Sequence, residues 1–404
     1  MSCKEKKECI CCGSEELELV LDLNDQPLAN SYHDNTESQS VFPLKLNVCT
    51  RCYHLQLSHI VDPDLMFKDY LYVSGTSQTL RDYFSWFANF AVETYIQTHR
   101  FGFKPRNVLD IACNDGSQLD SFENLGLNTF GVDPAENLHE ISSKRHSVVC
   151  DYFDSSTVDG NYYIITDQNV FAHNENGFQF LKDCKQIMEE ESLLFIQVSQ
   201  ADMVKENQFD TIYHEHLSFF CIKSFKALVD RSGLNLVDVI KTPVHGNSFV
   251  FTVSKRNINS SKIENSLFIE QSEGLHSLET YHNYAEKCKN ITKEFVSTVQ
   301  SFRSDGYKII GYGAAAKGNT FLNFAGTDLD YIVDDNSMKH NLYTPGRNIV
   351  IKHPDAILEE AEDSKLLFVP LAWNFFKEIK NKILSRRNKE SDKFLTYFPE
   401  VKVA

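Results

Sequence analysis

The chain has 404 residues, of which 42% are hydrophobic and 24% charged, so we expect an ordinary globular protein with two or three domains. A formal net charge of −16 at pH 7 argues against a nucleic-acid partner or binding to an anionic membrane surface. The sequence has no apolar run near the ~20 residues that span a bilayer and no N-terminal signal segment, which predicts a cytoplasmic protein with no membrane partner.

Two Cys-x-x-Cys pairs, Cys9 with Cys12 and Cys49 with Cys52, lie within residues 1–60. Each turn brings two thiolates to one ion, and two such turns complete a tetrahedral zinc site. We therefore expect a zinc-binding module over this range, and the zinc should be structural because the protein supplies all four ligands. Reduced surface thiols are the alternative. A redox role is less favoured, because no βαβ pattern surrounds either pair.

Helical periodicity covers residues 61–100, and the segment 70–77 interrupts it. From Leu80 the apolar positions continue at helical spacing, and we expect them to form core packing. Residues 105–255 then alternate apolar strands with helical patterns, which predicts a parallel, doubly wound α/β sheet. The expected strands are 107–111, 128–132, 162–166, 193–198, 235–240 and 248–254.

The last of these strands follows its predecessor after a short link at 245–247. A short link cannot make a parallel crossover, so the last strand should be antiparallel. An α/β sheet with a reversed final edge strand is typical of class I methyltransferases, which have a Rossmann-like core. We therefore expect a methyltransferase domain over residues 61–255.

Residues 256–304 carry no strand pattern and should form one or two linking helices. From residue 306 a strand, a glycine loop and a helix follow, with further strands expected at 329–334 and 365–369. These features predict a smaller, Rossmann-like α/β domain. The third expected domain is thus the helical linker with this unit, residues 256–404.

A candidate methyl-donor loop lies in residues 108–116, between an expected strand and a helix. Asp110 and Asp115 would place anions near a sulfonium or an amino group, and Asp133 at the next strand end can accept hydrogen bonds from ribose hydroxyls. Only Gly116 is a glycine, so this acidic loop favours S-adenosylmethionine (SAM) over NAD. A tight turn with acidic caps is the alternative. The cofactor-binding residues that we expect are Asp110, Cys113 (as a small spacer), Asn114, Asp115, Gly116, Asp133 and His173, which follows the strand expected to end over the donor.

Tyr213, Glu215 and His216 form a dense group of proton-handling side chains. Histidine titrates near neutral pH, glutamate can orient an imidazole, and tyrosine can donate to a developing oxyanion. We expect these three residues to be catalytic. A solvated turn is the alternative, and a metal site is disfavoured because no third ligand accompanies the His-Glu-His run.

A second glycine loop, residues 311–318, opens a helix after a strand. Small residues let phosphates approach the helix N-terminus, where backbone amides favour anions. Lys317 could add a positive charge, and residues 334–336 could reach hydroxyls. Strand–helix packing without a ligand is the alternative. The substrate-binding residues that we expect are Gly311, Tyr312, Gly313, Ala314, Ala315, Lys317, Asn319, Asp335 and His245.

Taken together, these motifs resemble the bacterial sugar-nucleotide C-methyltransferases, which make branched-chain deoxysugars. The likeness spans nearly the whole chain, and residues 345–346 and 373–374 also fit. The matching segments are 26–30, 113–116, 131–135, 213–217 and 311–319.

The resemblance implies that SAM binds the middle domain. A nucleotide-diphosphate 4-keto-6-deoxysugar would lie between the middle and C-terminal domains, with its diphosphate near the second glycine loop. A base removes the C3 proton, the C4 oxygen becomes an enolate, and C3 attacks the methyl group. The resemblance assigns His216 as the base, assisted by Tyr213 and Glu215, and Tyr72 as a contact to donor or substrate.

Two residues depart from the family pattern: Gln197 stands where glutamate is usual, and Asn247 where glycine is usual. They put the sugar configuration in question more than the reaction. The nucleotide base stays open, and we expect a monomer. Three alternatives remain: O- or N-methylation of a sugar nucleotide, a non-catalytic zinc-containing binding protein, and an NAD oxidoreductase that uses the second glycine loop.

Overall fold

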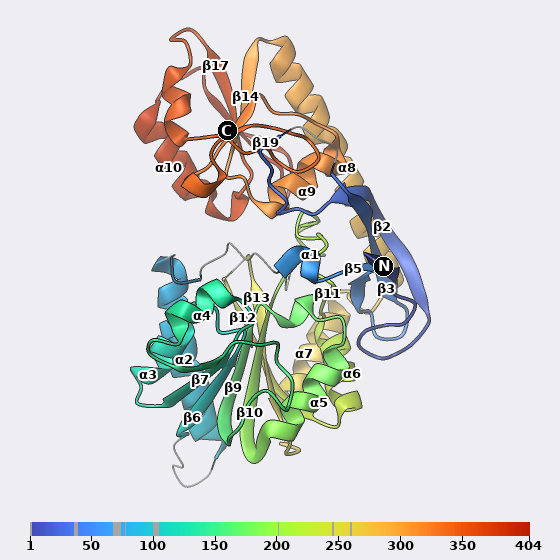
Figure 1. The fold of residues 1–404 in the computed structure, drawn as a ribbon. Helices are drawn as coiled ribbons and strands as arrows, with labels where there is room; N and C mark the ends of the chain where they lie inside the picture. The colour runs from blue at the N-terminus through green and yellow to red at the C-terminus, as the bar shows by residue number, and fades with distance from the viewer. Residues whose placement is uncertain are drawn as a thin grey trace.

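The computed structural model describes residues 2–35, 39–67, 74–76, 78–99, 105–200, 202–244, 246–258 and 261–404. Tyr72 and His245, both expected at the site, lie outside these described residues. The chain forms two α/β lobes, and the N-terminal strands lie along one side of both (Figure 1). Within the described ranges, no helix is long and apolar enough to cross a membrane.

An N-terminal module of short antiparallel strands precedes the lobes. Its long hairpin joins β2 (Leu17–Pro27) to β3 (Val41–Cys49). The sheet order is β11-β4-β3-β2, with β4 at Leu55–Leu57 and β11 at Ser218–Phe219. A separate pair joins β1 (Cys3–Glu5) to β5 (His59–Val61). Because β11 comes from far along the chain, the module's sheet is completed by a segment of the middle region.

The middle sheet has seven strands in the order β12-β13-β10-β9-β6-β7-β8. Its central strands are apolar on both faces, as expected for a sheet covered by helices on both sides. Its strands are β6 (Asn107–Ile111), β7 (Asn128–Val132), β8 (Ser147–Val149), β9 (Tyr162–Gln168), β10 (Met188–Ser199), β12 (Asn235–Thr242) and β13 (Ser248–Ser254). Its helices are α2 (Gln78–Thr98), α3 (Ser117–Glu123), α4 (Glu136–Ser142), α5 (Gly177–Ile187) and α6 (Ile222–Ser232).

The reversed strand is antiparallel, as the short link predicts, but its expected place at the sheet edge is wrong. Strand β13 pairs antiparallel with both β10 and β12, so it lies inside the sheet and β12 forms the edge. The physical reason is that every position of β13 is buried, and an edge strand would leave one side of this apolar run unpaired.

Aromatic side chains fill both faces of the middle sheet. Under α2, the ring of Phe87 packs edge-to-face on Phe122 and on Phe195 of β10. On the other face, Phe225 of α6 stacks on Phe251 of β13 with ring centroids 3.8 Å apart. The aromatic stripe of α2 is therefore core packing, as its spacing predicts.

The C-terminal lobe follows two helices, α7 (Ser261–Ser272) and α8 (Leu278–Ser304). Its sheet order is β16-β15-β14-β17-β18-β19, parallel except for β19. The elements are β14 (Tyr307–Tyr312), α9 (Ala316–Ala325), β15 (Tyr331–Val333), β16 (Ile351–Lys352), β17 (Lys365–Pro370), α10 (Phe376–Arg386), β18 (Lys393–Thr396) and β19 (Lys402–Val403).

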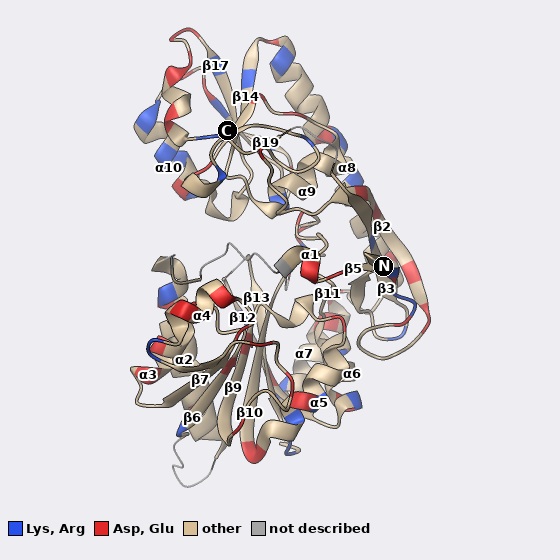
Figure 2. Ribbon diagram, in the orientation of Figure 1, with Lys and Arg blue, Asp and Glu red and all other residues tan. Residues whose placement is uncertain are grey.

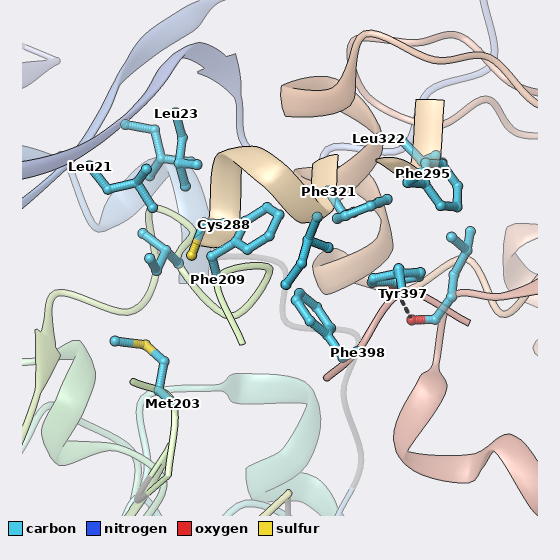
Figure 3. Packing of buried hydrophobic residues seen from close by; sticks show 14 of the residues in the cluster. Leu21, Leu23, Met203, Phe209, Cys288, Phe295, Phe321, Leu322, Tyr397 and Phe398 are labelled. Carbon is cyan, nitrogen blue, oxygen red and sulfur yellow. Dashed lines mark hydrogen bonds between the residues drawn. The ribbon is translucent and has the colours of Figure 1, made fainter. Parts of the chain in front are cut away.

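One hydrophobic core connects the N-terminal module, the β10–β11 segment (residues 202–217) and the C-terminal lobe (Figure 3). Leu21 and Leu23 of β2 belong to it, as does the fully buried Phe209 of the β10–β11 segment. The ring of Phe209 lies 5.6 Å from that of Phe321 on α9 and 5.3 Å from that of Phe398. The segment that carries Tyr213, Glu215 and His216 is therefore anchored on the C-terminal lobe.

Candidate active site

The four expected zinc ligands converge in the N-terminal module. The Sγ atoms of Cys9 and Cys52 lie 3.5 Å apart, as do those of Cys12 and Cys49, and all four lie within 4.8 Å of one another. Zinc–sulfur bonds of about 2.3 Å in a tetrahedron require sulfur atoms roughly 3.8 Å apart. The four thiolates fit a structural zinc ion, and with all its ligands from protein the ion would hold the two turns together.

The two Cys-x-x-Cys turns have the same local geometry. The amide of Gly13 donates to Cys9 O (2.9 Å), and the amide of Tyr53 donates to Cys49 O (2.8 Å). Both residues that end the turns have positive φ, 74° at Gly13 and 61° at Tyr53. This conformation is sterically unfavourable for Tyr53, because it has a Cβ atom, but not for a glycine. Its ring stacks on Tyr281 of α8, which ties this turn to the linking helix.

The donor loop (residues 112–116) connects β6 to α3 with an irregular backbone. Ala112 and Asn114 adopt φ of 56° and 52°, and Gly116 adopts 83°. The carboxylate of Asp133 at the end of β7 accepts from the Asn114 amide (2.8 Å) and the Ala135 amide (2.9 Å). Positive φ at non-glycine residues is uncommon, and the two hydrogen bonds to Asp133 hold the loop in this conformation.

Asp110 lies beneath the donor loop on β6. Its Oδ1 accepts from the Thr166 hydroxyl (2.6 Å), and burial raises its pKa to about 7. Burial likewise raises the pKa of Asp167 on β9 to about 8. These two acids lie at the carboxyl ends of neighbouring parallel strands, where ligands of doubly wound sheets bind.

Cys113 packs against the next strand. A Cβ atom at Gly131 of β7 would lie 2.6 Å from Cys113 Sγ, and Cys113 is buried. The geometry agrees with the expected role of this cysteine as a small spacer.

The side chains of Asn114 and Asp115 hold a turn that sequence reasoning did not find. Asn114 Oδ1 accepts from the Ser74 amide, and Asp115 Oδ2 accepts from the Gly75 amide, both at 3.0 Å. These amides belong to the short 3₁₀ turn Ser74–Thr76. The interrupted helical pattern at 70–77 was the signal, but nothing in it pointed to the donor loop. The turn Ser74–Thr76 is therefore fastened to the donor loop.

His216 lies in the β10–β11 segment with both ring nitrogens engaged. Its Nδ1 is 2.8 Å from Thr211 O, and its Nε2 is 3.1 Å from the Tyr213 hydroxyl. A carbonyl only accepts, so Nδ1 carries the proton in the neutral ring and Nε2 presents its lone pair. The side-chain nitrogen of Gln200 lies 3.2 Å from the same Nδ1. A 180° flip of this side-chain amide places its oxygen there instead, where it also accepts from the Nδ1–H group.

His173 faces His216 from another element. It ends the 3₁₀ turn Phe171–His173 after β9, and its ring centroid lies 5.1 Å from that of His216. Burial lowers the pKa of His173 to about 4, so this ring is neutral at physiological pH. The structure therefore brings His173 together with the expected proton-transfer group.

Glu215 and His214 point to different surroundings. Glu215 Oε1 accepts from Asn30 Nδ2 at 2.6 Å, and burial raises the pKa of Glu215 to about 7. His214 also contacts the N-terminal module, through β3, with Nε2 3.3 Å from Phe42 O and its ring edge-to-face with Phe42. His214 therefore packs structurally, whereas Glu215 is a buried carboxylate held by Asn30.

At the second glycine loop, as at the donor loop, a carboxylate at the end of the neighbouring strand accepts hydrogen bonds from two backbone amides. Asp334 at the end of β15 accepts from the Ala314 amide (2.6 Å) and the Asn336 amide (2.7 Å). The neighbouring Asp335 accepts from the Tyr312 hydroxyl (3.1 Å) and pairs with Lys382 of α10 (3.0 Å). Figure 2 marks Lys and Arg residues along α10, and acidic residues on α1 (Asp64–Phe67) and α4.

The glycines of this loop serve close packing. A Cβ at Gly311 would lie 2.7 Å from Ile332, and one at Gly318 would lie 2.7 Å from Leu371. Gly313 has φ of 87°, which glycine adopts at no steric cost. Strand–helix packing thus accounts for Gly311 and Gly318, and backbone conformation for Gly313.

Lys317 and Asn319 of α9 face protein groups. Lys317 Nζ lies 5.1 Å from the Trp373 ring centroid, and burial lowers its pKa while the charge of Asp210 opposes that change. Asn319 Nδ2 donates to Ala29 O at 2.8 Å. Both side chains therefore connect α9 to other parts of the chain.

Three family models match the chain in succession. A zinc binding domain matches residues 9–67, a methyltransferase domain matches residues 89–239, and a C-methyltransferase C-terminal domain matches residues 243–399. With the fold and the four-thiolate cluster, they define the class: the chain is a SAM-dependent C-methyltransferase with a structural zinc site.

A curated relative supports this assignment over nearly the whole chain. The protein is 28% identical to C-methyltransferase NovU from Streptomyces niveus, over 92% of this chain and 91% of the relative. Among solved structures, the plantazolicin methyltransferase BpumL in complex with SAH is 16% identical, covering 44% of this chain and 86% of its own, with a TM-score of 0.36. The magnesium protoporphyrin IX methyltransferase ChlM from Synechocystis PCC 6803 with bound SAM is 11% identical, covering 48% and 98%, with a TM-score of 0.36.

Proposed function

We propose that this enzyme transfers the methyl group of SAM to C3 of a nucleotide-diphosphate 4-keto-6-deoxysugar. The observation that carries the proposal is the buried imidazole of His216, with Nδ1 against a carbonyl and Nε2 against a phenol. A sugar carbon next to a ketone becomes nucleophilic when it loses a proton, and the ketone acidifies that proton. Methylation of a hydroxyl or an amine needs no such carbon acid.

In this mechanism the Tyr213 hydroxyl turns from His216 Nε2 toward the C4 oxygen of the sugar, and the lone pair that this frees on Nε2 takes the C3 proton. Thr211 O, 2.8 Å from Nδ1, then stabilises the imidazolium and holds the ring orientation. Tyr213 donates its hydroxyl proton toward the developing C4 enolate oxygen. Glu215, whose pKa burial raises to about 7, assists by orienting the reacting groups. When bound, SAM would supply a methyl group from its sulfonium to C3, and the S–CH3 bond would break to leave the neutral thioether S-adenosylhomocysteine.

The donor loop and its neighbours form the proposed SAM site. Asp133 accepts from two backbone amides and has further lone pairs, which would accept hydrogen bonds from the ribose hydroxyls. The backbone amides of the loop would lie close to the ligand. Asp110 would lie beneath the donor, with Cys113 as spacer. We assign to this site Asp110, Cys113, Asn114, Asp115, Gly116, Asp133, Tyr72 and His173.

The sugar nucleotide would lie at the second glycine loop. The N-terminus of α9 favours an anion through its amides and dipole, and the diphosphate is the anion proposed. We assign to this site Gly311, Tyr312, Gly313, Ala314, Ala315, Lys317, Asn319, Asp335 and His245.

The proposal includes three domains, residues 1–60, 61–255 and 256–404, in a cytoplasmic monomer. The test is a mass-spectrometric screen of nucleotide 4-ketosugars with SAM. A gain of one methylene mass, located at C3 by NMR, is expected. A methyl group found on oxygen or nitrogen would favour the alternative chemistry, and calorimetry without SAM binding would favour a non-catalytic binding protein.

A further inference from the structure

A short strap of the N-terminal module, residues 28–33, leaves β2 after Pro27 and reaches toward both lobes. Strand β2 contacts both α8 and α9, and it lies beside the region between the lobes in Figure 1. The zinc site does not explain this strap, because its four ligands lie at the turns around residues 9–12 and 49–52.

The strap is fixed on the C-terminal lobe at two points. Asn319 Nδ2 of α9 donates to Ala29 O at 2.8 Å. The hydroxyl of Tyr32 donates to Ala314 O at 2.6 Å, and the Ala314 amide is itself held by Asp334. The strap is thus attached to the backbone of the second glycine loop.

Between these two points, Asn30 contacts the proton-transfer group. Its Nδ2 donates to Glu215 Oε1 at 2.6 Å. Glu215 is 7% exposed, whereas Asn30 is exposed, so the amide covers the carboxylate from the open side. A hydrogen bond of this length holds one carboxylate oxygen of Glu215 at a defined position.

We propose that Asn30 is a positioning residue of the active site, which holds the Glu215 carboxylate in the orientation that the reaction uses. This inference rests on the proposed function for the catalytic role of Glu215. It assigns a task to the segment 26–30, which neither the zinc site nor the donor loop explains.

The electrostatics give the proposal a measurable consequence. Burial raises the pKa of Glu215, and the Asn30 amide lowers it, because a donor stabilises the charged form. Tyr32 of the strap interacts with the Glu215 charge, and burial raises the pKa of that phenol, so it stays neutral. On its own segment Glu215 has Tyr213 and His216 as neighbours, while His214 turns away. Loss of the Asn30 donor should therefore shift the Glu215 titration to higher pH.

The test compares Asn30→Ala with Asn47→Ala in the zinc-loaded full chain. Asn47 lies on β3 of the same module and is half-buried. Infrared pH-difference spectra follow the carboxylic-acid band that disappears in Glu215→Gln. In Asn30→Ala this band should titrate at higher pH than in wild type, and kcat at pH 7 should fall about tenfold or more, with partial recovery at higher pH. Zinc content and SAM affinity should stay unchanged, and Asn47→Ala should match wild type.

The spectroscopic arm needs no substrate, so it separates this inference from the proposed function. A shifted band in an enzyme that methylates no sugar nucleotide would support the Asn30–Glu215 contact and reject the substrate class. An unshifted band with an unchanged pH profile of kcat would overturn the proposal. If Asn30→Ala loses zinc or unfolds, Asn30→Asp keeps the side-chain volume and places an acid beside Glu215. In Asn30→Asp the Glu215 band should titrate at a still higher pH than in Asn30→Ala. An unshifted band in Asn30→Asp would also overturn the proposal.

Discussion

The indole Nε1 of Trp373 donates a 2.7 Å hydrogen bond to Oδ2 of Asp210. Asp210 is fully buried in the β10–β11 segment, and burial raises its pKa to about 6. Trp373 lies in the C-terminal lobe, just after β17. The bond therefore joins the segment that carries His216 to the lobe proposed to bind the nucleotide.

We predict that Trp373→Phe lowers the free energy of unfolding by about 1–3 kcal/mol, because it leaves a buried carboxylate oxygen without its donor. Urea unfolding followed by circular dichroism measures the change. Trp86→Phe is the matched control, since Trp86 is 43% exposed on α2, and it should have little effect. Equal stability of Trp373→Phe and wild type would show that this bond does not hold the segment in place.

Loss of zinc should impair methyl transfer through the N-terminal module. In Cys12→Ser one of four thiolates is removed, so zinc affinity falls and the turns at both Cys-x-x-Cys pairs lose their cross-link. The strap that carries Asn30 is part of this module, so loss of zinc should displace Asn30 from Glu215. Turnover should therefore fall, while calorimetry still detects SAM binding. Cys150→Ser, at an exposed cysteine, is the control. Full turnover in a zinc-free Cys12→Ser enzyme would contradict this coupling.

The donor loop should be sensitive to one added carbon atom. Gly131→Ala places a Cβ 2.6 Å from Cys113 Sγ, so the loop must shift and SAM affinity should fall about tenfold or more. Cys113→Ala removes the sulfur atom that the new Cβ would meet, so the double variant should recover part of the lost affinity. Calorimetry measures all three variants. Equal SAM affinity in Gly131→Ala and wild type would show that the loop position does not control donor binding.

Gln197, a departure from the family pattern, offers a test of folding and binding together. Its amide is fully buried on β10 and has no hydrogen-bond partner among the described residues. Gln197→Met removes an unpaired polar group at similar volume, so the free energy of unfolding should stay equal or rise. If the amide binds a ligand, the same variant should raise KM or the SAM dissociation constant. Destabilisation by more than ~1 kcal/mol, measured without ligands, would indicate protein partners for this amide instead.

The alternation of strand and helix signals made much of the fold predictable. Strands at 107–111, 128–132 and 248–254 appear at the expected bounds, because each is a short run with apolar residues that turn and helix signals bound. Strands of two or three residues, such as β8 and β16, carry too few positions for any periodicity. The place of β13 between β10 and β12 depends on tertiary pairing, which local sequence does not encode.

The site was predictable in its residue types but not in its contacts between distant segments. Tyr213 and His216 are neighbours in sequence, so their grouping follows directly from the motif. Asn30 lies 185 positions from Glu215, and a single asparagine in a strap gives no local signal. Lys317 has the positive charge expected of a residue that binds phosphate, yet its ammonium group lies over the ring of Trp373. Only the packing of α9 on the β10–β11 segment explains that orientation.

The most direct test of the central claim is solvent exchange at the sugar carbon. A nucleotide 4-keto-6-deoxysugar is incubated in deuterated water with the enzyme and without SAM, and NMR follows the C3 proton. Wild type should exchange this proton, and His216→Asn should lose at least about a hundredfold in exchange rate while still binding SAM. Equal exchange in wild type and His216→Asn would contradict the account of His216 as the base that makes the carbon nucleophile.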